Sequence, residues 1–153
     1  MGTTHSIWED LLEETSFTLF ALHSNLEDYA LAYHLNLGCG LRLSRYKEDL
    51  ELASDVAFPF FHWDDEVNQR EWTLFANRAD ILETQQTGGL FSEAGAARRH
   101  YLIPERKNVD YFLKIEGDVS ESQVHESLRS LPQLTTAYAL EPDGLKSKLN
   151  LIL

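Results

Sequence analysis

The stretch LIPERKNVDYFLKI, residues 102–115, carries the clearest structural pattern in the chain. In its second half, apolar and more polar residues alternate with a period of two, which predicts a β-strand over residues 109–117 with one strongly apolar face. Pro104 favours an extended conformation at Ile103 and removes a backbone donor. The residues that follow, ERKN, are typical of a polar turn. The stretch therefore predicts two short extended segments joined by a turn.

The residues after this stretch continue with elements of different type. Residues 120–131 are amphipathic at helical spacing, and Ser120 with Gln123 fits a capping box at the start of a helix. Residues 134–140 and 145–153 have the pattern of strands, with a turn between them that has proline at its second position. We expect residues 102–153 to form a motif-containing β-α-β-β half.

The chain before the stretch shows a similar order. Residues 16–24 are apolar at both alternating sets of positions, which indicates a strand covered on both faces. Residues 25–37 predict a helix with Ser24 or Asn25 as its N-cap, ended by the glycines that follow. The apolar residues that recur at helical spacing in this segment are Leu26, Tyr29, Ala30, Tyr33 and Leu37.

The remaining segments are assigned by composition and alternation. A strand is expected to begin at residue 41, and the aromatic runs 56–63 and 71–77 predict an antiparallel hairpin. Pro59 places its strand at an edge or a bulge. Residues 78–100 show little regular pattern and predict a long irregular loop. Residues 1–15 predict an N-terminal helix, because apolar residues lie on one side of it and acidic residues elsewhere.

The two halves repeat the order strand, helix, strand, strand. This repetition predicts a single domain, residues 1–153, of the α+β class. We expect a mainly antiparallel sheet with two or three helices packed on it and with ferredoxin-like β-α-β units. The composition, 43% hydrophobic, is sufficient for the core of one domain of this length.

The charge of the chain limits its partners. Thirteen Lys and Arg against 25 Asp and Glu give a net charge of −12, which disfavours nucleic acid and an anionic membrane surface. A single cysteine, Cys39, excludes an intramolecular disulfide and a multi-cysteine zinc site. The chain shows neither a membrane-length apolar run nor a signal-peptide pattern. We expect a cytoplasmic protein whose partner is another protein or a second copy of the chain.

The opening stretch also carries a resemblance. Ile103-Pro104-Glu105, three intervening residues and Val109-Asp110-Tyr111 resemble the signature of the IPExxxVDY family at all six named positions. That family is a group of small single-domain proteins of the Bacteroidota, whose biochemical role is not established. The resemblance implies membership of an uncharacterised bacterial family, and it implies no activity, cofactor or catalytic residue.

The motif has a functional and a structural interpretation. In the first, Glu105 and Asp110 form a pair of carboxylates near the hydroxyl of Tyr111 that binds a cation or a basic group. In the second, Glu105 accepts backbone N–H groups or pairs with an arginine, Asp110 anchors the other end of the turn, and the ring of Tyr111 packs in the core. The structural interpretation is favoured, since unpaired buried carboxylates are costly.

Two other groups of residues are candidates for binding. Aromatic side chains concentrate on the predicted hairpin, and because both faces of it are apolar, some of them need cover from another element or a partner chain. This possible interaction surface comprises Phe58, Phe60, Phe61, Trp63, Trp72 and Phe75. Arg98 and Arg99 are possible contacts for an anion.

No catalytic motif or metal-binding spacing is recognisable. The acidic run after His62 could supply oxygen ligands, but it lacks the spacing of an EF-hand, and we expect neither a metal nor a cofactor. The sequence favours a non-catalytic cytosolic domain that acts through protein interaction or regulation. The alternative is a small-ligand sensor or enzyme that uses Glu105, Asp110 and Tyr111 with Arg98 or Arg99.

Overall fold

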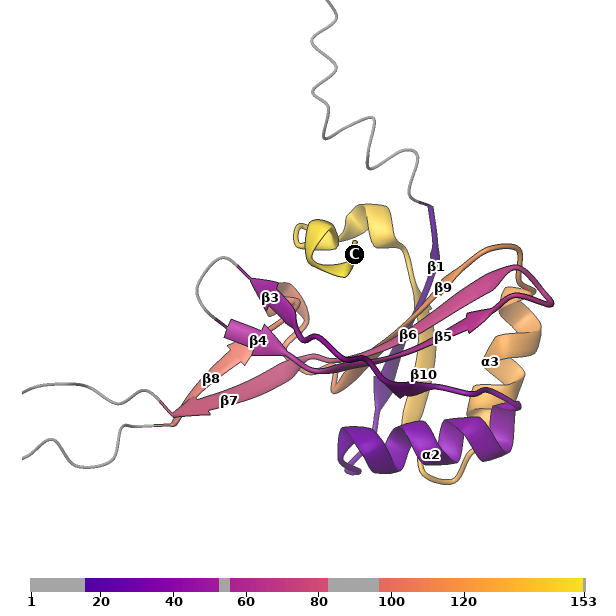
Figure 1. Ribbon diagram of the computed structural model, residues 1–153, viewed down its shortest axis with the longest axis horizontal. Helices are drawn as coiled ribbons and strands as arrows, with labels where there is room; N and C mark the ends of the chain where they lie inside the picture. Colours follow the sequence, from indigo (N-terminus) through magenta and orange to yellow (C-terminus); the bar gives the residue numbers. More distant parts are fainter. Residues whose placement is uncertain (1–15, 53–55, 83–96, 153) are drawn as a thin grey trace, which may run out of the picture.

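The computed structural model describes residues 16–52, 56–82 and 97–152 (Figure 1). The described residues form a six-stranded antiparallel sheet with two α-helices, which confirms the predicted α+β class and the mainly antiparallel sheet. The helix expected over residues 1–15 lies outside the described residues.

The elements follow one another along the chain in a simple order. They are β1 (Thr18–His23), α2 (Asp28–Cys39), β2 (Ser44–Arg45), β3 (Leu50–Leu52), β4 (Val56–Phe58), β5 (Phe60–Asp65), β6 (Arg70–Ala76), β7 (Arg78–Leu82), β8 (Ala97–Tyr101), the 3₁₀ helix η1 (Pro104–Arg106), β9 (Tyr111–Glu116), α3 (Glu121–Arg129), β10 (Thr136–Leu140), and the 3₁₀ helices η2 (Pro142–Gly144) and η3 (Lys148–Leu151).

The large sheet has the strand order β10-β1-β9-β6-β5-β2, with antiparallel neighbours throughout. Since β9 and β10 both run antiparallel to β1, they are parallel to each other, and the connection through α3 passes over β1. Two small antiparallel pairs, β3-β4 and β7-β8, complete the described strands. The ferredoxin-like assignment stays a prediction.

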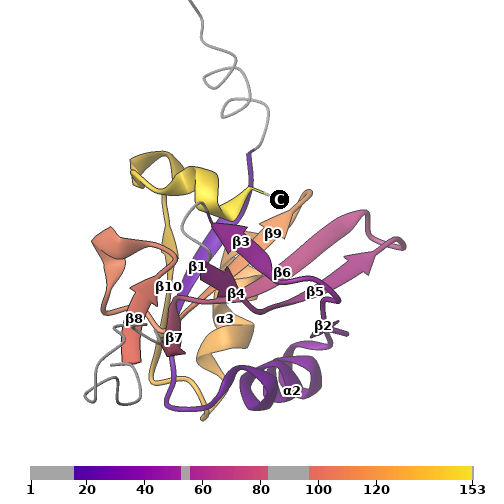
Figure 2. The same ribbon diagram turned by 60° about the vertical axis from the view of Figure 1, so that its left-hand side comes forward.

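The sheet is covered on both faces (Figures 1 and 2). On one face α2 and α3 enclose a core that includes Phe20, Leu22, Leu35 and Leu113. On the other face the C-terminal 3₁₀ segment and the turn around η1 enclose a second core. This second core includes Leu19, Ala21, Phe58, Phe75, Ile103, Val109, Phe112 and Leu151. Adjacent residues of β1 thus enter different cores, as predicted for a strand covered on both faces.

Helix α2 differs from the prediction in its start and in its buried face. Its N-cap is Glu27 rather than Ser24 or Asn25. The hydroxyl of Ser24 instead donates to the carbonyl of Gln133 at 2.9 Å and thereby links the end of β1 to the chain before β10. The helix buries Leu31, Ala32 and Leu35, whereas Tyr29, Tyr33 and Leu37 are 63%, 59% and 68% exposed.

The prediction of a long irregular loop over 78–100 was wrong at both of its ends, and the prediction of a final strand over 145–153 was wrong. Strands β7 and β8 form an antiparallel pair at the two ends of residues 78–101. Residues 83–96 between them lie outside the described residues. Residues 78–82 alternate between polar and apolar over only four positions, and residues 97–101 do not alternate, so the sequence of either strand alone is a weak signal. The C-terminal segment forms η3, because burial of both Lys148 and Leu151 requires a spacing of three rather than two.

Other predicted elements are present with shifted ends. The hairpin β5-β6, strand β9, helix α3 with its Ser120 cap, and strand β10 all appear. The strand expected from residue 41 is shorter, since only Ser44–Arg45 pairs with β5. Pro59 separates β4 from β5, as a residue without a backbone donor does.

Candidate functional site

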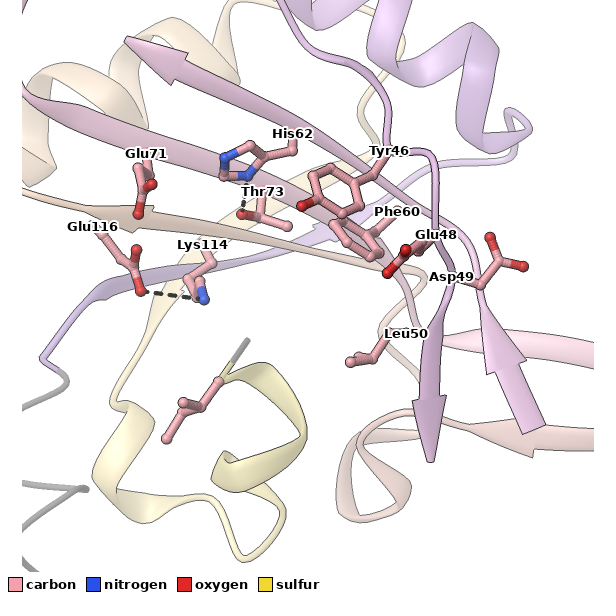
Figure 3. Close-up of a pocket in the computed structure, with 11 residues that line it drawn as sticks. Tyr46, Glu48, Asp49, Leu50, Phe60, His62, Glu71, Thr73, Lys114 and Glu116 are labelled. Atoms are coloured by element: carbon pink, nitrogen blue, oxygen red, sulfur yellow. Dashed lines mark hydrogen bonds and ion pairs between the residues drawn. The ribbon is translucent and has the colours of Figure 1, made fainter. Parts of the chain in front are cut away.

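A cavity of about 540 Å³ opens on the sheet face opposite the two helices. Its floor is formed by β5, β6 and β9, and its walls by residues 46–50 and the C-terminal segment (Figure 3). The volume lies within the range of about 300–1,000 Å³ that is usual for small-molecule sites. This cavity is the candidate functional site.

The floor is polar because the side chains that three neighbouring strands place on this face change from aromatic to polar along each strand. On this face each strand has a buried aromatic ring at or next to one of its ends, Phe60 in β5, Phe75 in β6 and Phe112 in β9. Polar residues follow at every second position, on the same face. The sheet register aligns His62 with Thr73 and Thr73 with Lys114 in one row, and Glu71 with Glu116 in a parallel row. The second core therefore gives way to a polar surface.

Lys114 lies at the base of the cavity with its side chain only 2% exposed. Its Nζ donates to the carbonyl oxygen of Leu151 at 2.7 Å and lies 3.4 Å from a carboxylate oxygen of Glu116. The rings of Phe17 and Phe75 flank it, with centroids 5.5 and 5.9 Å from Nζ. Burial lowers the pKa of Lys114, and the charge of Glu116 opposes this effect.

Glu71 and Glu116 form a coupled pair of carboxyl groups. The hydrogen bond with Glu116, together with burial and the charge of Glu116, raises the pKa of Glu71 to about 7. The same hydrogen bond is the largest cause that lowers the pKa of Glu116, and the charge of Lys114 adds to it. The pair thus shares one proton near neutral pH, because two adjacent carboxylates resist simultaneous ionisation.

The rim adds an imidazole and an aromatic wall. Nδ1 of His62 lies 3.0 Å from the hydroxyl of Thr73, and burial lowers the pKa of His62, so the ring favours its neutral form. Tyr46 stacks on Phe60 with ring centroids 4.7 Å apart and remains 46% exposed. The site can therefore offer carboxylate acceptors, a hydroxyl, an imidazole and an exposed ring face to one molecule.

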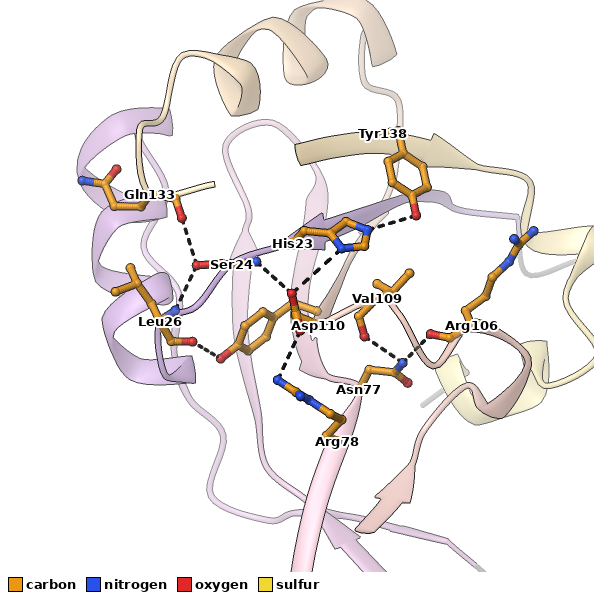
Figure 4. A network of polar contacts seen from close by, with 11 residues as sticks. His23, Ser24, Leu26, Asn77, Arg78, Arg106, Val109, Asp110, Gln133 and Tyr138 are labelled. Atoms are coloured by element: carbon orange, nitrogen blue, oxygen red, sulfur yellow. Dashed lines mark hydrogen bonds and ion pairs between the residues drawn. The ribbon is translucent and has the colours of Figure 1, made fainter. Parts of the chain in front are cut away.

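The IPExxxVDY-like segment lies elsewhere and is held by a residue outside the motif. Asn77, fully buried between β6 and β7, accepts a hydrogen bond on Oδ1 from the amide of Ile103 at 2.8 Å. Its Nδ2 donates to the carbonyls of Arg106 and Val109 at 2.8 and 2.9 Å (Figure 4). Ile103 and Val109 are themselves fully buried. The motif thus closes a turn around one asparagine side chain.

The motif carboxylates bind to different segments. Asp110 accepts the backbone N–H of Ser24 at 3.0 Å and pairs with the guanidinium of Arg78 at 3.2 Å (Figure 4). Glu105 accepts both the amide and the hydroxyl of Ser147, at 2.8 and 2.7 Å, just before η3. Burial opposes ionisation of Glu105, but hydrogen bonds from backbone amides and Ser147 hold its pKa below the usual range. This arrangement agrees with the structural interpretation.

Tyr111 packs its ring in the helix-side core, and its hydroxyl donates to the carbonyl of Leu26. Burial, followed by the charges of Asp28 and Asp110, raises the pKa of Tyr111 to about 12. A second cavity of about 380 Å³ lies beside Asp110 and Tyr111, with Arg99 on its lining. Arg99 is exposed, while the side chain of Arg98 lies outside the described residues.

The aromatic residues expected to form an interaction surface are buried within this chain. Phe61 and Trp72 lie in the core beneath the helices, and Trp63 is partly buried against them. The other three, Phe58, Phe60 and Phe75, lie in the second core. Of the two alternatives for covering these rings, another element or a partner chain, the structure shows the first, because elements of the same chain cover both faces of the hairpin.

The acidic run at the end of β5 also has a structural role. Asp65 is buried and accepts hydrogen bonds from the backbone and the side chain of Asn68, at 3.3 and 2.8 Å, and so closes the β5-β6 turn. Among the residues that the structure describes, no group of three or more His, Cys, Asp or Glu side chains could hold a metal ion.

Sequence reasoning missed the 540 Å³ cavity. Alternation within β9 correctly separates Lys114 and Glu116 from the helix-side face, but it cannot indicate that a second layer covers Lys114. The available signal was the change from aromatic to polar residues in three separate strands, FFHWDD, REWTLFA and YFLKIE. This signal becomes a site only when the register of the strands is known.

Comparisons with known proteins add no relative. No family model matches the chain, and neither a curated protein nor a solved structure matches it. Within the described part of the chain, no helix has the length and apolar character needed to cross a bilayer. The fold and the cavity define a small α+β protein with a polar pocket on one face of its sheet.

Proposed function

We propose that this protein binds a small polar molecule in the 540 Å³ cavity and acts as a binding or sensing domain. The observation that supports this proposal is the polar floor, in which a buried lysine lies beside two carboxyl groups that share a proton. Such groups are costly to keep inside a fold, and apolar residues would stabilise the same position better. Perturbed titratable groups in a cavity are typical of functional sites.

The proposal places the ligand away from the motif. The motif residues Glu105, Asp110 and Tyr111 have hydrogen-bond partners within the chain. They are therefore proposed as structural residues, and membership of the IPExxxVDY family remains a proposal that rests on the six matching positions. We also propose a cytoplasmic location and no nucleic-acid partner, on the basis of the single cysteine and the net charge of −12.

The test is nuclear magnetic resonance mapping with the full chain. A library of small molecules, with equal numbers of cationic, neutral and anionic compounds, is added to ¹⁵N-labelled protein. The expected result is that amide shifts from the compounds that bind cluster around Tyr46, Thr73 and Lys114. Shifts that cluster on α2, that scatter over the surface, or that are absent for every compound would contradict the proposal.

A second candidate function is association through α2. Tyr29, Tyr33 and Leu37 lie one turn apart on this helix and are each more than half exposed. Exposed apolar side chains in a row are typical of an interaction surface. We propose a second copy of the chain as the partner, because the row is nearly symmetric about Tyr33 and could pack on itself antiparallel. Sedimentation velocity of wild type and of Tyr33→Asp tests this proposal, and a monomer at every wild-type concentration would contradict it.

A further inference from the structure

We infer that the cavity selects a small organic cation, with an ammonium or guanidinium group at the Glu71–Glu116 pair and an apolar body against Tyr46. This inference rests on the proposed function, since it names the class of ligand for the same cavity. It is argued from the charges that face the cavity, from the partners of each charged group, and from the aromatic wall.

The charged groups around the cavity are mostly acidic. Glu48, Asp49, Glu71 and Glu116 line it, and Lys114 supplies a single positive charge. Asp49 is paired with the guanidinium of Arg45, which leaves three carboxyl groups to consider. His62 favours its neutral form. An anion in this cavity would therefore lie among carboxylates, whereas a cation would be attracted by them.

The buried lysine does not offer its charge to a ligand. Its Nζ is engaged by the carbonyl of Leu151 and by Glu116, and its side chain is 2% exposed. An anionic ligand would have to displace these partners and would leave the Leu151 carbonyl without its donor, which costs free energy. Lys114 therefore offsets the charge of Glu116 from a buried position, while Glu71 and Glu116 line the cavity and can meet a donor there.

The Glu71–Glu116 pair holds a proton where a cationic donor would fit. Glu71 and Glu116 are directly paired residues of β6 and β9, both line the cavity, and their carboxyl groups repel each other when both are ionised. An ammonium or guanidinium group can replace that proton with several charge-assisted N–H···O bonds, which are stronger than neutral ones. The position of the pair on the floor, at the open polar end of β6 and β9, makes it accessible from the cavity (Figure 3).

The aromatic wall favours an organic cation with a flat or apolar body. The ring of Tyr46 is 46% exposed and is held by stacking on Phe60, with centroids 4.7 Å apart. A ring face of this kind attracts a cation and covers apolar surface at the same time. The cavity therefore combines a charged end and an aromatic end.

The experiment compares three probes of nearly equal size: benzylamine, which is cationic at neutral pH, benzyl alcohol and benzoate. Each is titrated into the full chain by nuclear magnetic resonance, with calorimetry for affinity. We expect benzylamine to bind at least about tenfold more tightly than benzyl alcohol, with benzoate the weakest. Its amide shifts should lie at His62, Thr73 and Lys114. MgCl₂ is added as a separate probe for a metal ion.

The variant Glu71→Gln identifies the group that binds the cation. Glu71 is exposed at the open end of the floor, and a neutral amide there removes the repulsion from Glu116, so the fold is retained. The expected loss of benzylamine affinity is about tenfold, with no loss for Glu126→Gln, which removes an exposed acid on α3 outside the cavity.

Each contrary outcome has a defined meaning. If benzoate or benzyl alcohol binds in the cavity as tightly as benzylamine, the inference about the ligand class is overturned while the proposed function stands. If Mg²⁺ alone perturbs the pair, or if Glu71→Gln binds benzylamine as wild type does, the organic-cation site is likewise overturned. If benzylamine does not bind at millimolar concentration, the inference fails, and the fragment mapping decides the proposed function separately.

Discussion

Asn77 shows how one polar side chain can organise a turn that has little regular hydrogen bonding of its own. It is fully buried, and its side chain joins the two ends of the IPExxxVDY-like segment through three hydrogen bonds. Figure 4 shows the two that reach Arg106 and Val109. Its backbone amide also donates to Asp110, and its carbonyl accepts from Leu102. The segment is therefore anchored by a residue more than 20 positions away in the sequence.

We predict that Asn77→Ala lowers the free energy of unfolding by about 3 kcal/mol, because it leaves the buried amide of Ile103 and the buried carbonyl of Val109 without their partner. Urea unfolding monitored by tryptophan fluorescence measures this change. Asn108→Ala, at an exposed position of the same segment, is the matched control and should remain within about 0.5 kcal/mol of wild type. Equal effects of the two substitutions would refute the anchoring role of Asn77.

The shared proton of the Glu71–Glu116 pair should also make the stability of the fold depend on pH. The pKa of Glu71 is raised to about 7, whereas an unfolded glutamate titrates near about 4.3. The folded chain therefore holds a proton that the unfolded chain has lost, and the stabilisation from this group is complete below the unfolded value and lost as pH rises through about 7.

Glu71→Gln should remove this dependence. We expect the variant to match wild type near about pH 4 and to become more stable than wild type as pH rises to about 8, because wild type must then ionise two adjacent carboxyl groups. Thermal unfolding across this range measures the difference, and Glu126→Gln on α3 is the control for loss of one negative charge. A constant difference at all pH values would show that the pair does not share a proton.

At the scale of elements, α2 ends at a residue with a left-handed backbone. Gly40 has φ of +69°, and no atom lies within 4 Å of the position that a Cβ would occupy. A side chain at this position would meet open space. The free-energy cost of a substitution therefore comes only from holding a non-glycine residue in the left-handed conformation. Gly144, in η2, also faces open space but has an ordinary φ.

The two glycines give a matched pair of substitutions. Gly40→Ala should lower the free energy of unfolding by about 1 kcal/mol, because an L-residue adopts the left-handed conformation at a cost. Gly144→Ala should be neutral or slightly stabilising, since it restricts the unfolded chain without strain in the folded one. Chemical denaturation of both variants measures the difference, and the prediction fails if Gly144→Ala is the more damaging change.

At the scale of the whole molecule, Lys114 joins the sheet to the C-terminal segment. Its Nζ donates to the carbonyl of Leu151 in η3, and Leu151 is itself fully buried in the second core. The segment covers the face of the sheet opposite the helices (Figure 2). Its residue Ile152 lines the cavity. The lysine therefore connects the layer that closes the second core with the floor of the candidate site.

We predict that Lys114→Met lowers the free energy of unfolding by about 2 kcal/mol or more, since it leaves the Leu151 carbonyl and Glu116 without their cation. Hydrogen exchange should accelerate first at the amides of residues 148–152. Lys146→Met, at an exposed lysine of the same segment, is the control and should leave both measurements unchanged. Unchanged exchange in Lys114→Met would mean that apolar packing alone holds the segment.

The two candidate sites differ in how far the sequence could predict them. The motif segment was recognisable because its nine residues are contiguous, and the turn and strand that they predict are present. Its anchor, Asn77, was not recognisable, because an asparagine at the end of a strand is an ordinary residue until the turn is folded around it. The cavity was not predicted, since its floor combines single residues from three strands and its walls come from two further segments.

The sequence by itself determined the elements whose period is local. Strand β9 was predictable from alternation, strands β1, β5 and β6 from apolar or aromatic runs, and helix α3 from its cap and amphipathic spacing, because each pattern lies within a few residues. The α+β class followed from their order. The tertiary structure decided which faces are covered. It exposed one side of α2, paired β7 with β8, made η3 a helical turn, and brought Lys114, Glu71 and Glu116 together. These outcomes depend on strand register and on a second layer, which are contacts between residues far apart in the chain.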